Sequence, residues 1–208
     1  MNKLSIVVPV YFNELNLKPL YEDIKKKIID VIDFEYEIIM VDDGSGDHSW
    51  TVMQELAAQD EHIKTLRLSR NFGSHAAILC GLSHSTGDCA VVKAADLQEP
   101  TELILEMYQA WTQGNNVVLA IRKGREDKSF FSDLYYWITR KFALSKMPSH
   151  GFDVFLVDRK VIHVLESLDE KNSAITGQIL WSGFRTAQIE YVRKEREIGH
   201  SRWTLLRK

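Results

Sequence analysis

Leu4-Ser-Ile-Val-Val-Pro-Val10 is an almost unbroken apolar run, and a segment with a different period follows it at once. From Glu14 to Ile32, apolar residues recur at the three- and four-residue spacing that is typical of an amphipathic helix. An apolar strand followed by such a helix is the repeating unit of a parallel sheet, because parallel strands are buried on both faces and need a long crossover between them. This stretch therefore indicates an α/β fold.

The same unit repeats through the first 125 residues. Further strands are predicted at 37–41, 64–68, 89–92 and 116–121, and further helices at about 47–59, 74–83 and 102–113. Repeated strand–helix crossovers of this length predict a doubly wound, mostly parallel sheet with helices on both faces.

After Arg125 the pattern changes. An aromatic-rich helix is predicted at 129–144, strands at 152–157 and 186–192, and helices at 161–167 and 174–181. The helical spacing of Trp111, Trp137 and Trp181 predicts that these side chains belong to the core. No linker rich in Pro, Gly or Ser interrupts the chain, so we expect a single domain over 1–208, made of two parts, 1–125 and 126–208, with different patterns.

The composition excludes several classes of protein. With 208 residues, 45% of them hydrophobic and 26% charged, the chain matches a globular protein, and its net charge of -3 argues against a general nucleic-acid binder. Cys80 and Cys89 make neither a disulfide framework nor a metal-ligand cluster. No signal peptide or membrane-spanning run is present. We expect a domain on the cytoplasmic side of a membrane, with any membrane helices beyond residue 208.

Acidic side chains follow three of the predicted strands: Glu14 after the first, Asp42 and Asp43 after the second, and the stretch Asp96-Leu-Gln-Glu99 after the fourth. Ligands of open α/β sheets bind beyond the carboxyl ends of the strands. Any one aspartate here has a simpler reading as a turn or helix-cap residue, since Asp-Gly-Ser is a common turn sequence. Three acidic stretches at one edge favour a ligand site.

The residue types indicate which ligand this is. The sequence has neither a Gly-x-Gly-x-x-Gly fingerprint nor a P-loop. Carboxylates accept hydrogen bonds, which suits the N–H groups of a base or the hydroxyls of a ribose. The oxygen atoms of Asp96 and Gln98 suit Mg2+ or Mn2+, either of which would bridge a diphosphate. Arg70-Asn-Phe-Gly73, just before a predicted helix, is either a phosphate-binding turn or a plain helix cap.

Eight stretches in order along nearly the whole chain resemble the successive motifs of glycosyltransferase family 2. The likeness is closest to its polyprenyl-phosphate branch, which is similar to dolichol-phosphate mannose synthase. The stretches are Val7-Val-Pro-Val-Tyr-Phe-Asn-Glu14, Val41-Asp-Asp-Gly-Ser45, Leu68-Ser-Arg-Asn-Phe-Gly73, Ala95-Asp-Leu-Gln-Glu-Pro100, Arg122-Lys-Gly-Arg125, Leu156-Val-Asp-Arg159, Trp181-Ser-Gly-Phe184 and Arg196-Glu-Ile-Gly-His-Ser-Arg-Trp203.

The resemblance implies the nucleotide-sugar-binding (GT-A-like) α/β fold and inverting sugar transfer from a nucleotide sugar. By position, Pro9, Tyr11 and Glu14 would line the nucleotide pocket, and Asp42 would meet the base or ribose. Asp96 would be a metal ligand and Gln98 a second one. The family usually has a carboxylate two residues before Asp96, where this chain has Ala94.

The resemblance also implies the groups that contact phosphate. Arg122 and Arg125 correspond to the phosphate-contacting arginines, and we add Arg196 as a third candidate for stabilising the leaving diphosphate.

The acceptor stays open between two classes at this point. The segment 193–208 holds six Arg or Lys against two Glu. Within it, Ser201, Arg202 and Trp203 suit the anionic head group of a polyprenyl phosphate at the inner face of a membrane. A hydroxyl acceptor on a glycan would instead need a carboxylate base, for which Glu99, Glu126 and Asp127 are the candidates. A third interpretation is a non-catalytic binder of nucleotides or lipid head groups.

Overall fold

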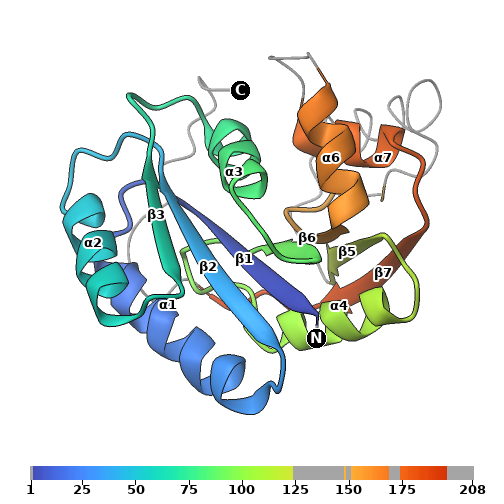
Figure 1. The fold of residues 1–208 in the computed structure, drawn as a ribbon, viewed down its shortest axis with the longest axis horizontal. Coiled ribbons are helices and arrows are strands. Elements are labelled where there is room, and N and C mark those ends of the chain that lie inside the picture. The colour runs from blue at the N-terminus through green and yellow to red at the C-terminus, as the bar shows by residue number, and fades with distance from the viewer. Residues whose placement is uncertain (1, 124–147, 149–150, 169–173, 196–208) are drawn as a thin grey trace.

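A computed structural model of the chain describes residues 2–123, 148, 151–168 and 174–195 (Figure 1). Its centre is a seven-stranded sheet in the order β3-β2-β1-β4-β6-β5-β7. The strands are β1 (Lys3–Val10), β2 (Glu35–Asp42), β3 (Ile63–Arg67), β4 (Cys89–Val92), β5 (Val117–Arg122), β6 (Val154–Asp158) and β7 (Thr186–Tyr191).

The sheet is parallel except at one strand. β1 pairs in parallel with β2 on one side and β4 on the other, β3 extends the sheet beyond β2, and β7 is parallel to β5. β6 lies antiparallel between β4 and β5. The prediction of a mostly parallel sheet is therefore confirmed.

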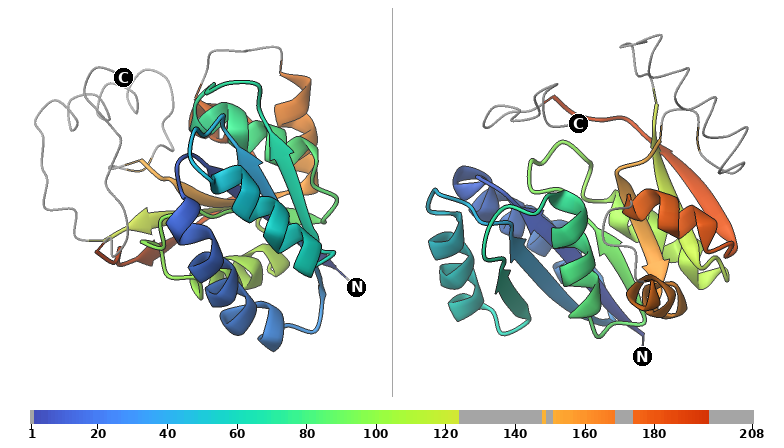
Figure 2. Two further views of the ribbon diagram at one scale, coloured as in Figure 1. Left: turned by 90° about the vertical axis from the view of Figure 1, so that its left-hand side faces the viewer. Right: turned by 90° about the horizontal axis from the view of Figure 1, so that it is seen from above.

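Helices cover both faces of the sheet, as a doubly wound fold requires (Figure 2). A buried apolar cluster lies on each face of the sheet. One cluster joins the sheet to α1, α2 and α4, and the other joins it to α3, α6 and α7. The helices are α1 (Glu14–Lys27), the 3-10 helix η1 (Ile29–Val31), α2 (Ser49–Gln59), α3 (Ser74–Ser83), α4 (Leu103–Thr112), α6 (Arg159–Ser167) and α7 (Ile175–Trp181).

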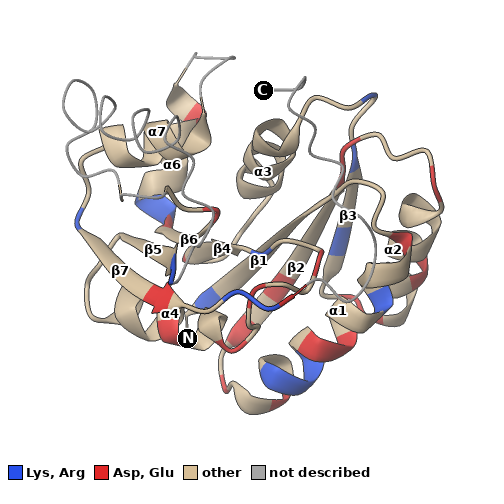
Figure 3. Cartoon of the chain, turned by 180° about the vertical axis from the view of Figure 1, so that it is seen from behind, with Lys and Arg blue, Asp and Glu red and all other residues tan. Residues whose placement is uncertain are grey.

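Burial on both faces explains why β1 is apolar throughout. Val8 packs in the cluster under α1, while its neighbour Val7 packs under α3. Gly81 lets α3 approach β1 closely, because a Cβ there would meet Cγ1 of Val7 and lie 3.3 Å from Cγ2 of Val41. Charged side chains are accordingly found on helices, loops and strand ends rather than along the middle of the central strands (Figure 3).

Three predicted features differ from the structure. The first helix ends at Lys27 rather than at Ile32, because Ile28 leaves helical geometry at φ -117° and a short 3-10 turn follows. The second helix begins at Ser49, since the carboxylate of Asp47 accepts the Ser49 N–H and caps the turn. Trp181 was expected in the core but is 68% exposed at the end of α7. The aromatic-rich helix at 129–144 and Trp137 lie outside the described residues.

Membrane-spanning elements are not found in the described ranges. The described helices lack the length and apolar character needed to cross a bilayer.

A buried polar cluster holds the amino ends of the central strands together. Glu37 is 2% exposed and accepts hydrogen bonds from Ser5 Oγ at 2.7 Å, Thr86 N at 2.6 Å and Lys64 Nζ at 2.7 Å. Burial alone would raise the pKa of Glu37, but these donors together outweigh it and lower the pKa to about 2. The charge links β2 to β1, to β3 and to the turn before β4.

We predict that Glu37→Gln lowers the free energy of unfolding by about 1–3 kcal/mol near neutral pH, because an amide turns an N–H toward donors that need an acceptor. Lys64 is half exposed, so solvent screens its share. The pKa of Glu37 is lower in the folded state, so its contribution is complete above about pH 4.5 and declines as the pH falls toward 2. Urea midpoints should therefore show wild type and variant converging in acid.

The control is Glu35→Gln, an exposed position in the same strand, which should change the midpoint little. A Glu37→Gln midpoint equal to that of wild type at neutral pH would contradict the role given to this cluster.

Candidate functional site

The carboxyl ends of β1, β2 and β4 bring three acidic loops to one edge of the sheet. Val10 is level with Asp42 in the β1–β2 pair, and the Asp43 N–H donates to Val10 O at 2.8 Å. On the other side of β1, the Lys93 N–H donates to Val7 O at 2.9 Å. The prediction that these stretches share an edge is confirmed by the pairing.

The loop after β1 is tied to the loop after β2. Tyr11 N–H donates to the Asn13 side chain, and Phe12, at φ 55°, donates its N–H to Ser45 Oγ at 3.0 Å. Glu14 accepts the His48 N–H at 2.7 Å, so the predicted nucleotide-pocket carboxylate supports the start of α2 in this conformation. Pro9 is half-buried within β1.

Asp42 and Asp43 are both buried, and each has a partner within the protein. Asp42 accepts the Ser45 N–H at 3.0 Å and lies 3.1 Å from Nε of Arg67. Asp43 accepts the N–H groups of Phe72 at 2.7 Å and Gly73 at 2.9 Å. Burial raises the pKa of Asp43, while those two donors oppose the rise. Asp43 therefore shapes the loop 70–73, which the sequence predicted as either a phosphate-binding turn or a plain helix cap.

The loop 70–73 contains two of the residues that the sequence predicts to bind substrate, Arg70 and Gly73. Gly73, at φ 96°, precedes α3 and adopts a backbone conformation that favours glycine. Arg70 is exposed, with its guanidinium 4.0 Å from the centre of the Phe72 ring. The structure thus leaves the charge of Arg70 at the surface beside the acidic edge.

Gly44 allows the second and third loops to touch. It has φ 69°, and a Cβ at this position would lie 2.5 Å from Arg70 C and 2.7 Å from Asn71 N. Both the conformation and the space exclude a side chain here.

The loop after β4 directs two predicted metal ligands to one point. Asp96 Oδ1 accepts the Gln98 N–H at 3.2 Å, and Leu97 between them has φ 59°. Gln98 Nε2 donates to Lys194 O at 3.2 Å, while the Lys194 N–H donates to Gln98 O at 2.8 Å. The segment that follows β7 is thereby held against this loop.

Arg193 is the group on which these oxygen atoms converge. One terminal nitrogen, NH2, lies 2.8 Å from Gln98 Oε1, 3.3 Å from Asp96 Oδ2 and 3.7 Å from Glu99 Oε1. One positively charged group therefore lies against both oxygens that the sequence predicts as metal ligands. A carboxylate and an amide oxygen that both face one positive group fit a hard divalent ion.

Behind the loop lies a second, deeper pair of charges. Lys93 is 1% exposed, and its Nζ donates to Glu99 O at 2.8 Å and lies 3.7 Å from Glu99 Oε2. Burial lowers the pKa of Lys93 and raises that of Glu99. Glu99 is therefore part of the loop's support.

Protein ligands alone do not complete a metal site. In the described ranges there is no group of three or more His, Cys, Asp or Glu that could hold an ion. Asp96 and Gln98 would consequently share an ion with a diphosphate and water, which is how Mg2+ commonly binds.

Among the remaining predicted site residues, Arg122 ends β5 and is half-buried. Arg125, Arg196, Ser201, Arg202 and Trp203 lie outside the described residues. Sequence reasoning counted Arg193 only as part of a basic segment, although its place directly after a strand could have indicated the same edge. It also missed Asp153, an exposed carboxylate just before β6.

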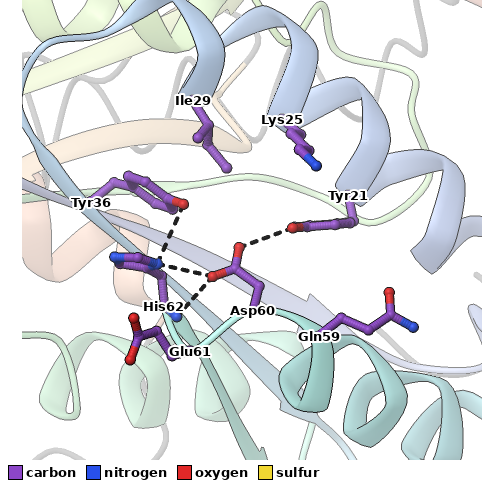
Figure 4. Close-up of a pocket in the computed structure, with 8 residues that line it drawn as sticks. All are labelled: Tyr21, Lys25, Ile29, Tyr36, Gln59, Asp60, Glu61 and His62. Carbon is purple, nitrogen blue, oxygen red and sulfur yellow. Dashed lines mark hydrogen bonds and ion pairs between the residues drawn. The ribbon is translucent and has the colours of Figure 1, made fainter.

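The described surface also has a hollow of about 350 Å³ at the opposite edge of the sheet, where β2 and β3 begin (Figure 4). Tyr21 Oη and the His62 N–H both donate to Asp60 there, at 2.9 Å. These contacts join α1 to the start of β3, far from the acidic loops. We place the ligand site by chemistry at the carboxyl edge rather than in this hollow.

The mostly parallel seven-stranded sheet with helices on both faces matches the GT-A fold of nucleotide-sugar transferases. Solved structures with the same fold include a mannosyltransferase from Pyrobaculum calidifontis in complex with GDP-Man and Mn2+ (TM-score 0.67, 17% identity, 94% of this chain and 57% of that one). Another is glucosyl-3-phosphoglycerate synthase from Mycobacterium tuberculosis with Mn2+ and UDP (TM-score 0.64, 16% identity, 95% and 73%).

Sequence comparison names the family. The profile described as "Glycosyl transferase family 2" matches residues 5–200, so the chain belongs to glycosyl transferase family 2. Its relatives include the uncharacterized glycosyltransferase YkcC of Bacillus subtilis (38% identity over 97% of this chain) and the bactoprenol glucosyl transferase of Shigella phage SfX (33% over 97%). The chain spans 63% of the first and 67% of the second.

We predict that Gly44→Ala destabilises the protein by at least about 1–2 kcal/mol, the cost of a side chain in the left-handed region, and weakens nucleotide binding by displacing the loop 70–73. Urea unfolding and nucleotide titration measure the two effects. The matched control is Gly46→Ala, whose Cβ would only reach ordinary contact with Phe12 at 3.4 Å. Equal behaviour of the two variants would show that the close approach at Gly44 is unimportant.

Proposed function

We propose that this chain is the catalytic domain of an inverting glycosyltransferase. It transfers a sugar from a nucleotide diphosphate sugar to polyprenyl phosphate at the cytoplasmic face of a membrane, in cell-envelope glycan synthesis. The observation that carries the proposal is the convergence of Asp96 and Gln98 oxygens on one cationic group, at the edge where the loops 42–45 and 70–73 meet.

The donor is inferred from that geometry and from the ligands named for solved structures with the same fold. Asp96 and Gln98 would hold Mg2+ or Mn2+, and the ion would supply positive charge to the diphosphate. The titles of two structures with this fold name Mn2+ together with GDP-Man or UDP. Asp42 and Asp43, with Pro9, Tyr11 and Glu14, would then contact the nucleoside.

Arginine side chains would stabilise the leaving group. As the bond from the anomeric carbon to the diphosphate breaks, negative charge grows on the diphosphate oxygen, and one well-placed donor there contributes about 3 kcal/mol. Arg122 ends β5 at the same edge of the sheet. Arg125 and Arg196 are the further candidates by sequence, and Arg70 and Gly73 stand at the start of α3.

Polyprenyl phosphate is proposed as the acceptor because its phosphate is charged. A phosphate oxygen is already anionic near neutral pH, so it attacks the anomeric carbon without a base, and a single displacement inverts the configuration. Support comes from the name of a relative that is 33% identical, a bactoprenol glucosyl transferase. Ser201, Arg202 and Trp203 would receive the head group at the membrane surface.

A glycan hydroxyl is the second candidate acceptor, because it needs a base and the edge carries an exposed carboxylate, Asp153. Glu99, proposed from the sequence for this role, is 3% exposed and faces Lys93, so it is poorly placed to take a proton from an acceptor. Glu126 and Asp127 lie outside the described residues.

Incubation of the chain with radiolabelled nucleotide sugars, Mn2+ and detergent-dispersed polyprenyl phosphate should yield a labelled lipid. Acid-labile sugar phosphate in the organic phase is the measurement, and polyprenol without phosphate is the matched acceptor control. Labelled glycans without labelled lipid, from the same donors, would refute the phosphate acceptor and favour the hydroxyl reading.

Asp96→Asn should weaken Mn2+ binding by more than about tenfold, since even residues that only support a metal ligand contribute that much. Calorimetric titration measures the affinity, and sugar transfer should fall with it. Asp33→Asn, an exposed carboxylate outside the three acidic loops, is the control and should leave both unchanged. Nucleotide binding without release of nucleoside diphosphate, even in wild type, would instead identify a non-catalytic binder.

A further inference from the structure

The loop 96–99 is balanced in charge by the protein itself. Asp96 and Glu99 contribute two negative charges, and Lys93 and Arg193 contribute two positive ones within the distances given above. Each carboxylate has a cation beside it before any ion arrives. A divalent cation added to this arrangement would meet two positive charges and no unbalanced negative one.

Arg193 takes the same oxygen atoms that the ion needs. Its NH2 group lies 2.8 Å from Gln98 Oε1 and 3.3 Å from Asp96 Oδ2. An ion bound by both oxygens would approach each of them to about 2.1 Å. A guanidinium and a dication at such distances from the same two oxygens would lie close to each other, and their like charges would repel.

The guanidinium also has an incomplete set of bonds where it lies. Among the described residues, Arg193 Nε and Glu99 Oε2 are buried atoms with no hydrogen-bond partner. Such groups are costly to leave unpaired. The arrangement on Asp96 and Gln98 is thus not the one that satisfies Arg193 best, and Glu99 Oε1 offers its NH2 group a third acceptor at 3.7 Å.

We infer that Arg193 is a built-in counter-ion of the metal loop: its guanidinium and a divalent cation bind Asp96 Oδ2 and Gln98 Oε1 in mutual exclusion. The inference rests on the proposed function, because it takes these two residues as the metal ligands. Release of Arg193 onto Glu99 accompanies binding of the ion. The negative charge of a nucleoside diphosphate then restores the balance, so the ion binds far better with the nucleotide than alone.

This role makes Arg193 a determinant of cation affinity. It also bears on Ala94, which stands where the family usually has a further carboxylate: without that charge, Lys93 and Arg193 fully balance the two carboxylates of the loop. Arg193 holds the loop in place when no ion is bound, and the ion displaces Arg193 when it binds.

The test is Mn2+ binding to the full chain without nucleotide, by calorimetry, for wild type and Arg193→Gln. Removal of the competitor should tighten Mn2+ binding on the order of tenfold, the equivalent of one charge-assisted hydrogen bond. Lys194→Gln removes the same charge from the next residue, whose contacts with Gln98 are made by its backbone, and should change the affinity less than about twofold. The Mn2+ affinity of Arg193→Lys should lie between the affinities of Arg193→Gln and Lys194→Gln.

A second readout is thermal unfolding. Arg193→Gln should melt several degrees below wild type in EDTA, since about 1 kcal/mol corresponds to 2–4 °C at this size, and the gap should close in saturating Mn2+. Equal or weaker Mn2+ affinity in Arg193→Gln, with binding still lost in Asp96→Asn, would overturn this inference alone. Absence of Mn2+ binding in wild type and every variant, with and without UDP, would overturn the proposed function as well.

Discussion

Burial of the sheet on both faces is the constraint from which the rest of the molecule follows. β1 lies at the centre, its side chains pack alternately into two apolar clusters, and neither face can accept a charge without a partner. Polar chemistry is thereby driven to the ends of the strands. Several parallel strands end at the same edge, so the acidic loops that follow them lie together there. The position of the candidate site therefore follows from the burial of the sheet.

The acidic residues of that edge make contacts within the protein that fix its loops. Asp43 holds the loop 70–73, Asp42 meets Arg67, and Glu99 is matched with Lys93. Each pairing offsets part of the cost of removing a carboxylate from water, although burial still raises the pKa of Asp43 and of Glu99. Because these pairs fix the loops, the site proposed here for a diphosphate is preorganised.

Most of the fold could be predicted from local sequence patterns, whereas the features that depend on contacts between distant residues could not. The strands at 89–92 and the helix at 74–83 follow directly from apolar periodicity, and the turn at Gly44 from its residue types. The reversed direction of β6 leaves no trace in local periodicity. Neither does the contact of Arg193 with Asp96, which joins residues 97 positions apart. Trp181 shows a third limit: on a helix of seven residues, spacing cannot decide which side meets the core.

The antiparallel β6 has a consequence for how such a protein can diversify. β5 ends at Arg122 and β6 begins at Val154, and their opposed directions put both points at the same edge as the acidic loops. The chain that joins them starts and finishes beside the acidic loops. A change in its length or composition need not alter the pairing of β5 with β6, so under the proposed function the acceptor could change there while the loops of the donor site keep their geometry.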